Sequence, residues 1–536
     1  MVTLSADSAT ASFKTEDVVL VRRRPGQSGG SYDVFSLEES TEDGQPPFKL
    51  AQSQVADVPQ DIPSHLLVEQ VPEHLLGGPS RKVHVLVSTG SGTGRAAAFY
   101  EAALRPLLGA LGLTAASEGA GAISGAEGKN RYNLVTTTDG QSIREFGRTL
   151  ADENDGTATK DDDNVGVMHT IVILSGDGGI VELLNSKAPA DGASSSEGRD
   201  RKRSPQPPLV AILPLGTGNA LFNSLHKLVI EPPAPSSSLV QALRTLLTGA
   251  AAPLPSFRAD FSPGSRLITY QEGQQGSKKN GDASADSGDV VEVEEHADAV
   301  SHLRGAIVAS YGFHSQLVWE SDTPAYRRHG AQRFGMVAKE LLEESHAYDA
   351  VVEITTTNVE DGSSSSSSSY AKPEEGKRKK KKINRDRHAY VLATLVSNLE
   401  KTFTISPASR PLDGRLRLVH FGDVGGERTM EVMMRAYDGG KHVGMRWGEA
   451  PAAAEAADDE VGVVAGAETE KEEEQVVGYE EVGEVKITTR ELDPRWRKVC
   501  IDGTIVELPQ GGSMTVTVED KGMTHLRILV DRSVIS

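Results

Sequence analysis

A single carboxylate stands among three glycines near the middle of the first half of the chain, in the segment Ser175-Gly176-Asp177-Gly178-Gly179. The apolar residues 171–174 before it are typical of a buried strand, and Glu182 and Asn185 follow in a helical pattern. Glycines let a phosphate or a hydroxyl group approach the backbone and Asp177, while a helix N-terminus offers free N–H groups. The segment therefore predicts phosphate chemistry. A glycine-rich turn with an exposed Asp and no ligand fits the same residues.

Two further glycine loops follow apolar segments of the same kind, after residues 83–87 and after residues 209–213. The first loop contains Ser88, Gly90, Ser91, Gly92 and Gly94, and the later one contains Gly216, Thr217, Gly218 and Asn219. Such loops can surround phosphates with backbone N–H groups. Three loops that meet at one place are a more specific signal than any one of them.

Strands that alternate with helices must position these loops. Residues 83–87, 132–137, 171–174 and 209–213 are predicted strands, and helical spacing follows at residues 99–108 and 143–150. This alternation favours a parallel sheet, whose ligands bind beyond the carboxyl ends of the strands. We therefore expect the three loops to converge on one edge of the sheet.

The second half of the chain changes character. From about residue 255, strand-like segments separated by turns predict an antiparallel sandwich: 256–261, 305–310, 350–354, 390–396, 415–419, 485–489 and 514–518. Residues 17–21 and 32–37 are strand-like as well, and could form a small meander or join a later sheet. We predict an extension over 1–78, partly β or disordered, an α/β domain over 79–240 and a β-rich domain over 241–536.

Composition narrows the function classes. The formal charge of −20 argues against a nucleic-acid partner, and the single Cys500 fits a reducing compartment. Without a signal segment or a long apolar run, we expect a cytoplasmic protein with peripheral membrane contact at most. Polar, low-complexity insertions are predicted near 271–299, 358–387 and 449–477. The basic run 377–382 could bind anionic lipid or direct nuclear import, but a solvated charge run in a loop is the simpler interpretation.

Taken together, these motifs resemble the diacylglycerol kinase catalytic-domain superfamily, and within it the sphingosine kinase and ceramide kinase branch. Ser88 stands where the first family loop has Asn, and residues 175–185 and 214–221 resemble the next two motifs. Residues 310–334 follow the order of the fourth sphingosine kinase motif. Segments 406–416 and 501–503 resemble the last two, with Thr504 in place of a Glu.

The resemblance implies an α/β nucleotide domain related to NAD kinase and phosphofructokinase, followed by a β-sandwich domain, with the site in the cleft between them. It implies ATP and Mg²⁺ as cofactors and a lipid alcohol as substrate, with Asp177 as general base. The nucleotide contacts that it implies come from Ser88, Gly90, Ser91, Gly92, Gly94, Thr137, Gly176, Gly178, Gly179, Glu182, Gly216, Thr217, Gly218, Asn219, Arg327, Arg333 and Asp502. Arginine suits phosphates because its planar fork can bind two oxygens.

The lipid itself is less defined. Sphingosine kinases place acidic residues just after the Gly-Phe pair, whereas residues 314–319 here contain no carboxylate before Glu320. A buried ammonium group without an anion is costly, so we expect a neutral lipid alcohol such as a diacylglycerol or ceramide, or several lipids. Departures at Ser88, Gly179 and Thr504 leave a catalytically impaired lipid- or nucleotide-binding relative as an alternative. An NAD kinase, which shares the Gly-Asp-Gly turn, is another.

Overall fold

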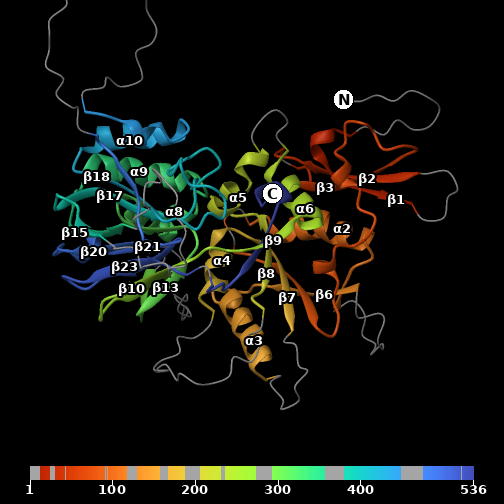
Figure 1. Cartoon of the computed structure of the whole chain (residues 1–536), viewed down its shortest axis with the longest axis horizontal. Helices are drawn as coiled ribbons and strands as arrows, with labels where there is room; N and C mark the ends of the chain where they lie inside the picture. The colour runs from red at the N-terminus through yellow and green to blue at the C-terminus, as the bar shows by residue number, and fades with distance from the viewer. Residues whose placement is uncertain are drawn as a thin grey trace, which may run out of the picture.

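The computed structural model describes residues 13–24, 31–42, 44–90, 92, 94–116, 130–156, 167–186, 206–230, 236–272, 293–356, 379–447, 475–520 and 522–535. In Figure 1 the α/β elements and the N-terminal strands lie on the right, and the antiparallel strands of the later chain lie on the left. Helix α5 lies where the two parts meet (Figure 1).

A seven-stranded, mostly parallel sheet organises the first part. Its order is β5 (Thr114–Ala115), β6 (Arg131–Thr136), β4 (Arg81–Val87), β7 (Met168–Ser175), β8 (Leu209–Pro214), β24 (Arg527–Val530) and β9 (Ala250–Pro253). Val87 pairs with Leu174, and Ser175 pairs with Pro214, so β4, β7 and β8 end side by side. The loops that follow these strands therefore start from one edge of the sheet.

Helices cover both faces of this sheet. They are α1 (Ala96–Phe99), a π-helical turn (Tyr100–Leu104), α2 (Arg105–Ala110), α3 (Ser142–Gly156), α4 (Asp177–Leu184), α5 (Ala220–Ile230) and α6 (Ser238–Thr248). Alternate residues of β7 enter different cores: Ile171 and Ile173 join the core that contains α3 and α4, whereas Val172 and Leu174 join the core that contains α2 and α6. A strand buried on both faces explains the unbroken apolar run before Asp177.

The N-terminal residues form a separate antiparallel sheet of β1 (Val18–Arg23), β2 (Tyr32–Glu39) and β3 (Phe48–Val55). Arg244 of α6 fixes it to the α/β part, because its Nε donates a 2.7 Å hydrogen bond to the Val18 carbonyl. Phe48 also packs edge-on against Phe99. Short 3₁₀ turns lie at Thr15–Asp17, Ser64–Leu66 and Glu73–Leu75.

Fourteen strands form the antiparallel sheet of the later chain. They are β10 (Phe257–Phe261), β11 (Arg266–Glu272), β12 (Val293–Ala299), β13 (His302–Gly305), β14 (Val308–Gly312), β15 (Tyr348–Thr356), β16 (Lys379–Lys382), β17 (Arg387–Thr394), β18 (Arg417–Gly422), β19 (Gly478–Glu481), β20 (Glu484–Thr489), β21 (Lys498–Ile501), β22 (Thr504–Glu507) and β23 (Ser513–Val518). The main order is β12-β11-β22-β21-β14-β17-β15-β20-β23-β10-β13. This β-rich part is consistent with the expected sandwich.

Four helices accompany this sheet: α7 (Phe313–Ser321), α8 (Pro324–Arg327), α9 (Gln332–Glu344) and α10 (Gly426–Tyr437). Further 3₁₀ turns lie at Lys441–Gly444, Pro494–Trp496 and Arg532–Val534. Helices α9 and α10 lie close together at the upper left of Figure 1. Gly426 brings α10 against the Leu342 carbonyl of α9, a contact that leaves no room for a Cβ atom.

The structure corrects several expectations. Residues 305–310 are not one strand, because the N–H groups of Ala306 and Ile307 donate to the Asp502 carboxylate between β13 and β14. The insertions predicted at 271–299 and 358–387 contain β12 and β16, whose backbones pair with β11 and β15 despite their polar composition. Lys379–Lys382 is thus a strand and not a loop. The rest of the run, 377–378, lies outside the described residues, as does most of 449–477.

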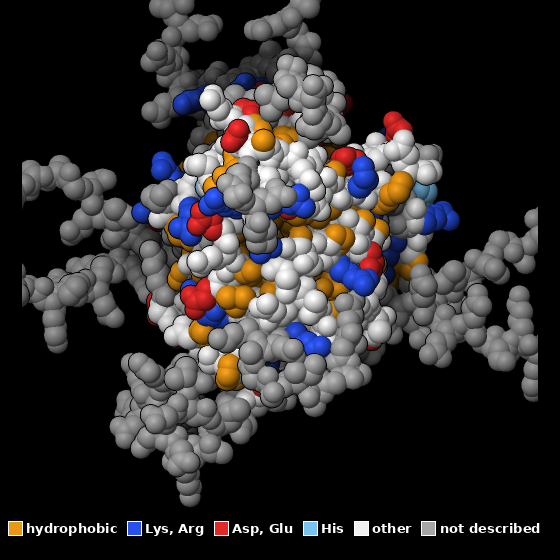
Figure 2. Space-filling view, turned by 90° about the vertical axis from the view of Figure 1, so that its right-hand side faces the viewer, with side chains coloured by type: hydrophobic (Ala, Val, Ile, Leu, Met, Phe, Trp, Pro, Cys, Tyr) orange, Lys and Arg blue, Asp and Glu red, His pale blue; other side chains and the backbone are white. Residues whose placement is uncertain are grey.

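The C-terminal strand also departs from a simple division of the chain. β24 pairs in parallel with β8 and antiparallel with β9. The last strand of the chain therefore belongs to the seven-stranded sheet of the first part, and so does β9, which lies beyond residue 240. The predicted domain boundaries at 78 and 240 stay predictions. Among the described helices, none combines the length and the apolar character that a membrane span requires. On the face shown in Figure 2, charged side chains of both signs are dispersed among hydrophobic ones.

Because β24 bridges β8 and β9, its burial contributes to the stability of the α/β part. Ile528 is fully buried, and we expect Ile528→Ala to lower the free energy of unfolding by about 2–5 kcal/mol through lost packing and a residual cavity. The matched control is Leu492→Ala, at a site that is 75% exposed, which should change it little. Urea unfolding followed by circular dichroism measures both. Equal stabilities for the two variants would contradict the docking of β24.

Candidate functional site

The three glycine loops touch one another above the ends of the parallel strands. A Cβ atom on Gly92 would lie 2.7 Å from the backbone nitrogen of Thr217, and one on Gly176 would lie 2.9 Å from the Gly216 Cα. Neither position has room for a side chain. The first loop therefore packs on the third, and the third packs on the loop that bears Asp177.

Hydrogen bonds hold each loop in shape. Asn219 adopts a left-handed conformation, with φ of 53°, and its side chain accepts from the Gly216 nitrogen at 3.0 Å and donates to the Gly216 carbonyl at 2.9 Å. The Thr89 nitrogen donates to Thr137 Oγ1 at 3.0 Å, which ties the first loop to the end of β6. Ser88 begins the first loop by donating its N–H to the Leu174 carbonyl. Asn219 and Thr137 thus have clear roles in supporting the loops.

The outer sides of these loops are open. A Cβ atom on Gly90, Gly94 or Gly178 would meet nothing within 4 Å, so the backbone there is accessible to a ligand. Gly178 also lies in the first turn of α4, whose N–H groups and dipole favour an anion. Gly179 differs, because it packs against Ile173 and Ser175 beneath the loop. Ser91 lies outside the described residues.

Asp177 lies at the centre of this arrangement and joins two helices. It begins α4, and its carboxylate caps α5: Oδ2 accepts from the Ala220 nitrogen at 2.7 Å and Oδ1 from the Leu221 nitrogen at 3.0 Å. Burial raises the pKa of Asp177, and the two backbone N–H groups oppose that rise. The side chain therefore combines a structural role with a higher affinity for protons than an exposed Asp has.

Asp502 is a second buried carboxylate, supplied by the later part of the chain. It accepts from the backbone nitrogens of Ala306 and Val308 at 2.6 Å each, and from that of Ile307. Burial is the main reason that the pKa of Asp502 is raised to about 7; the backbone donors oppose this rise, and the charge of Asp177 adds to it. The two carboxylates thus lie close enough for their charges to interact. They come from the second and the last of the motifs named above.

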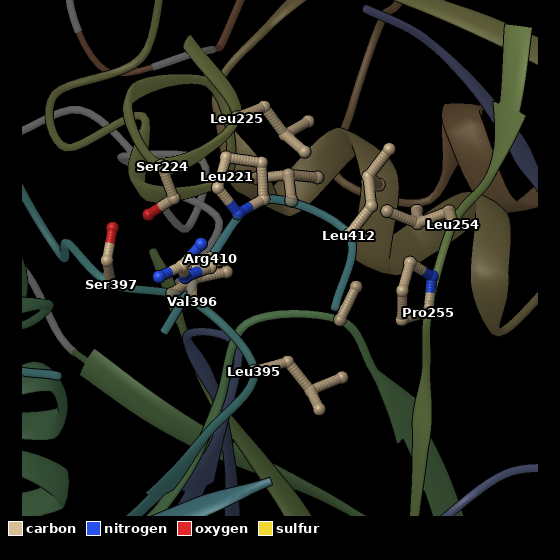
Figure 3. Close-up of a pocket in the computed structure, with 12 residues that line it drawn as sticks. Leu221, Ser224, Leu225, Leu254, Pro255, Leu395, Val396, Ser397, Arg410 and Leu412 are labelled. Atoms are coloured by element: carbon tan, nitrogen blue, oxygen red, sulfur yellow. The ribbon is translucent and has the colours of Figure 1, made fainter. Parts of the chain in front are cut away.

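A small pocket lies beside the two carboxylates, between α5 and the antiparallel part. Leu221, which donates to Asp177, and Ala306, which donates to Asp502, both line it. Figure 3 shows the Arg410 side chain close to those of Ser224 and Ser397, across the pocket from Leu254 and Pro255. Sequence reasoning did not select Arg410, although it lies within the segment 406–416. The pocket is built from segments far apart in the chain, so no local spacing marks it.

Three predicted nucleotide contacts are instead engaged in ion pairs. Glu182 forms a two-pronged pair with Arg144 of α3, at 2.7 and 3.1 Å. Arg327 binds both oxygens of Asp322, at 3.0 and 2.6 Å, and Arg333 lies 3.8 Å from the same carboxylate. Their roles toward ATP stay predictions. The two arginines lie beside the same carboxylate, that of Asp322.

Mg²⁺ is usually held by one or two carboxylates together with phosphate oxygens and water. Asp177 and Asp502 supply ligands of this chemical type. Within the described part of the chain, no group of three or more His, Cys, Asp and Glu side chains is arranged to hold a metal ion. The two carboxylates and the open glycine backbone thus fit a metal that arrives with its nucleotide phosphates. They do not form a metal cage of protein ligands alone.

Comparison with known proteins identifies the class of the α/β part. Residues 82–252 match the family model of the diacylglycerol kinase catalytic domain. No curated protein gave a significant match.

Two structures from Bacillus anthracis str. Sterne are similar in fold. One is a protein provisionally assigned as a diacylglycerol kinase, at 13% identity and a TM-score of 0.43, covering 84% of this chain and 96% of that one. The other is a diacylglycerol kinase, at 12% identity and a TM-score of 0.39, covering 84% and 98%. At this degree of similarity neither structure bears on the substrate of this chain.

The contact between the loops is directly testable. A Cβ atom on Gly216 would overlap the Gly176 backbone, so we expect Gly216→Ala to lower the thermal unfolding temperature by several degrees, through overpacking of about 1–3 kcal/mol. Gly90→Ala is the matched control, because its Cβ atom would enter open space. Differential scanning fluorimetry compares the two. An unfolding temperature for Gly216→Ala equal to that of Gly90→Ala would show that the loops do not touch.

The raised pKa of Asp502, about 7, predicts a pH-dependent stability. An Asp in an unfolded chain has a pKa of about 3.9, so between roughly pH 4 and 7 the folded protein binds a proton that the unfolded chain has released. The contribution of Asp502 to stability therefore falls as the pH rises through this window. We expect the unfolding temperature of the wild type, relative to Asp502→Asn, to increase from pH 8 to pH 5. A difference that does not change with pH would refute the shift.

Proposed function

We propose that the protein is an ATP-dependent lipid kinase that transfers the γ-phosphoryl group of ATP to the hydroxyl group of a lipid alcohol. The observation that supports this most is the contact of three glycine loops around Asp177, in a segment that matches the diacylglycerol kinase catalytic domain. Phosphoryl transfer depends mainly on positioning and on neutralisation of charge. Rigid loops of backbone N–H groups meet both requirements.

The residues around this point are suited to hold the nucleotide. Gly90, Gly94 and Gly178 leave backbone open to phosphate oxygens, and the first turn of α4 adds free N–H groups. Asp502 would help to hold the Mg²⁺ that accompanies ATP and neutralises its phosphates when bound. Ser88, Thr217 and Gly218 belong to the loops around this space, and we assign them to nucleotide binding with the remaining predicted contacts.

Asp177 is the proposed general base. The raised pKa of its carboxyl group makes it a better proton acceptor than an exposed Asp. Its two hydrogen bonds to α5 fix the carboxylate in one orientation. We expect it to receive the proton of the lipid hydroxyl group.

We further propose that the preferred lipid is uncharged, a diacylglycerol or ceramide, and not a sphingoid base. Gln316 donates to Glu320 at 2.6 Å, and the same Glu320 oxygen pairs with Arg495 at 2.9 Å, so the first carboxylate after Phe313 already has its cation. His314 has a pKa lowered by burial to about 4 and is neutral at physiological pH. An ammonium headgroup would find no spare anion in this segment.

A catalytically impaired relative is a second candidate, because both oxygens of Asp177 already accept backbone hydrogen bonds and Thr504 stands where the family has a Glu. Such a protein would bind a lipid or a nucleotide without transferring phosphate. The two candidates predict different results for phosphate transfer to a set of lipid acceptors, and for the effect of Asp177→Asn on that transfer.

The test measures phosphate transfer from labelled ATP to diacylglycerol, ceramide, sphingosine and NAD by the purified protein. We expect transfer to diacylglycerol or ceramide, and a loss of about 10²- to 10⁴-fold in Asp177→Asn, since a positioned general base contributes about that much. Asp438→Asn, an exposed Asp paired with Lys441, removes one carboxylate elsewhere and should keep full activity.

The other outcomes separate the alternatives. Equal background in the wild type and Asp177→Asn would leave a binding protein. A clear preference for sphingosine would refute the neutral-lipid proposal while keeping the kinase, and transfer to NAD alone would replace the lipid kinase with an NAD kinase.

A further inference from the structure

An unusual strand lies at the edge of the antiparallel sheet. β16 consists of four consecutive lysines, Lys379–Lys382, and all four are exposed. Its backbone pairs antiparallel with β15, from Glu353 opposite Lys382 to Thr356 opposite Lys379, and β15 is its only partner among the described strands. The lysines are therefore held in fixed positions along a sheet edge, although the sequence suggests a loose charge run.

These lysines carry an excess of positive charge. Lys382 pairs with Asp386 at 3.2 Å and Lys381 lies 4.0 Å from Glu480. Lys379 and Lys380 have no carboxylate partner within the part of the chain that the structure describes. The protein as a whole has a formal charge of −20, so this strand is a basic site on an acidic protein.

A groove of about 530 Å³ opens next to this strand, and its surface is mostly apolar although Glu484, Glu519 and Asp520 also line it. Glu519 is paired with Arg304, and Glu484 accepts a hydrogen bond from Thr355. Thr355 connects the two features, because it lines the groove and pairs with Lys380 across the sheet. Met523, which is 60% exposed, and Ile535, which is 48% exposed, lie on the groove. Large apolar side chains in such positions are typical of surfaces that receive a partner.

The groove also leads toward the candidate site. Leu254, Pro255 and Leu412 line it, and the same three residues line the small pocket beside Asp177 and Asp502 (Figure 3). The groove and the small pocket thus lie on either side of the same three side chains.

We propose that β16 and this groove form a docking surface for an anionic lipid bilayer. The lysines bind headgroup phosphates, and the groove receives apolar chain next to them. A lysine near an anionic membrane surface contributes attraction that salt screens, so binding should weaken as ionic strength rises. The choice of a bilayer as partner rests on the proposed lipid kinase function, but its test requires no catalysis.

A different role for the lysines makes an opposite prediction. Charged side chains on an edge strand also prevent pairing with another sheet, and either sign of charge serves that purpose. If edge protection were their whole role, reversal to Glu would leave the oligomeric state of the protein and its behaviour toward lipid unchanged. Charge reversal therefore separates the two roles.

The experiment is cosedimentation of the full chain with vesicles of phosphatidylcholine alone or with 30% phosphatidylserine, at low and high salt. We expect binding to the anionic vesicles only, and at least a tenfold loss of affinity when all four lysines are changed to Glu. The variant Lys379→Glu with Lys380→Glu leaves both ion pairs intact and should lose binding in the same direction. Replacement of all four lysines by Arg should retain it.

Matched controls define the result. Reversal to Glu of Lys14, Lys49, Lys339 and Lys441, four exposed lysines on other elements, changes the net charge equally and should not reduce binding. Met523→Gln with Ile535→Gln should weaken binding, while Leu492→Gln should not.

Binding by the β16 variants that equals wild type would overturn the proposal, as would binding to RNA and not to vesicles. A lipid-binding protein without kinase activity would keep this proposal and refute the proposed function.

Discussion

The close approach of three backbone loops is the constraint on which the site depends. Gly92 lies against Thr217, and Gly176 lies against Gly216, at separations that only residues without a Cβ atom permit. The parallel strands bring the loops together because β4, β7 and β8 end side by side, at the edge where α/β sheets bind ligands. The glycines thus have two distinct uses: some allow the loops to pack, and others, such as Gly178, leave open backbone above them.

Two buried carboxylates connect the separate parts of the chain. Asp177 caps α5 from the α/β sheet, and Asp502 binds the three backbone N–H groups between β13 and β14. Each carboxylate holds the structure around it, and their charges interact. Arg410 adds a cation at the pocket beside them (Figure 3). Phosphate chemistry needs this combination of fixed anions, cations and free N–H groups in one place.

Much of the α/β part could be predicted from the sequence, because hydrophobic period and glycine spacing are local signals. The later elements could not be predicted in the same way. β16 is a strand because it pairs with β15, and β24 joins the parallel sheet because it pairs with β8 and β9. The polar composition of β16 and the short length of β24 predict neither pairing. Similarly, motif matching selected Glu182 but could not reveal that Arg144 is its partner, and it missed Arg410. Side-chain partners from distant segments are fixed only by the fold.

If the three loops form one nucleotide site, they should respond to nucleotide as a unit. Hydrogen–deuterium exchange with and without a non-hydrolysable ATP analogue and Mg²⁺ measures this response. We expect residues 88–94, 175–179 and 215–219 to become protected together, over the same range of nucleotide concentration. Protection of one loop alone, or of none while the nucleotide binds elsewhere, would contradict it.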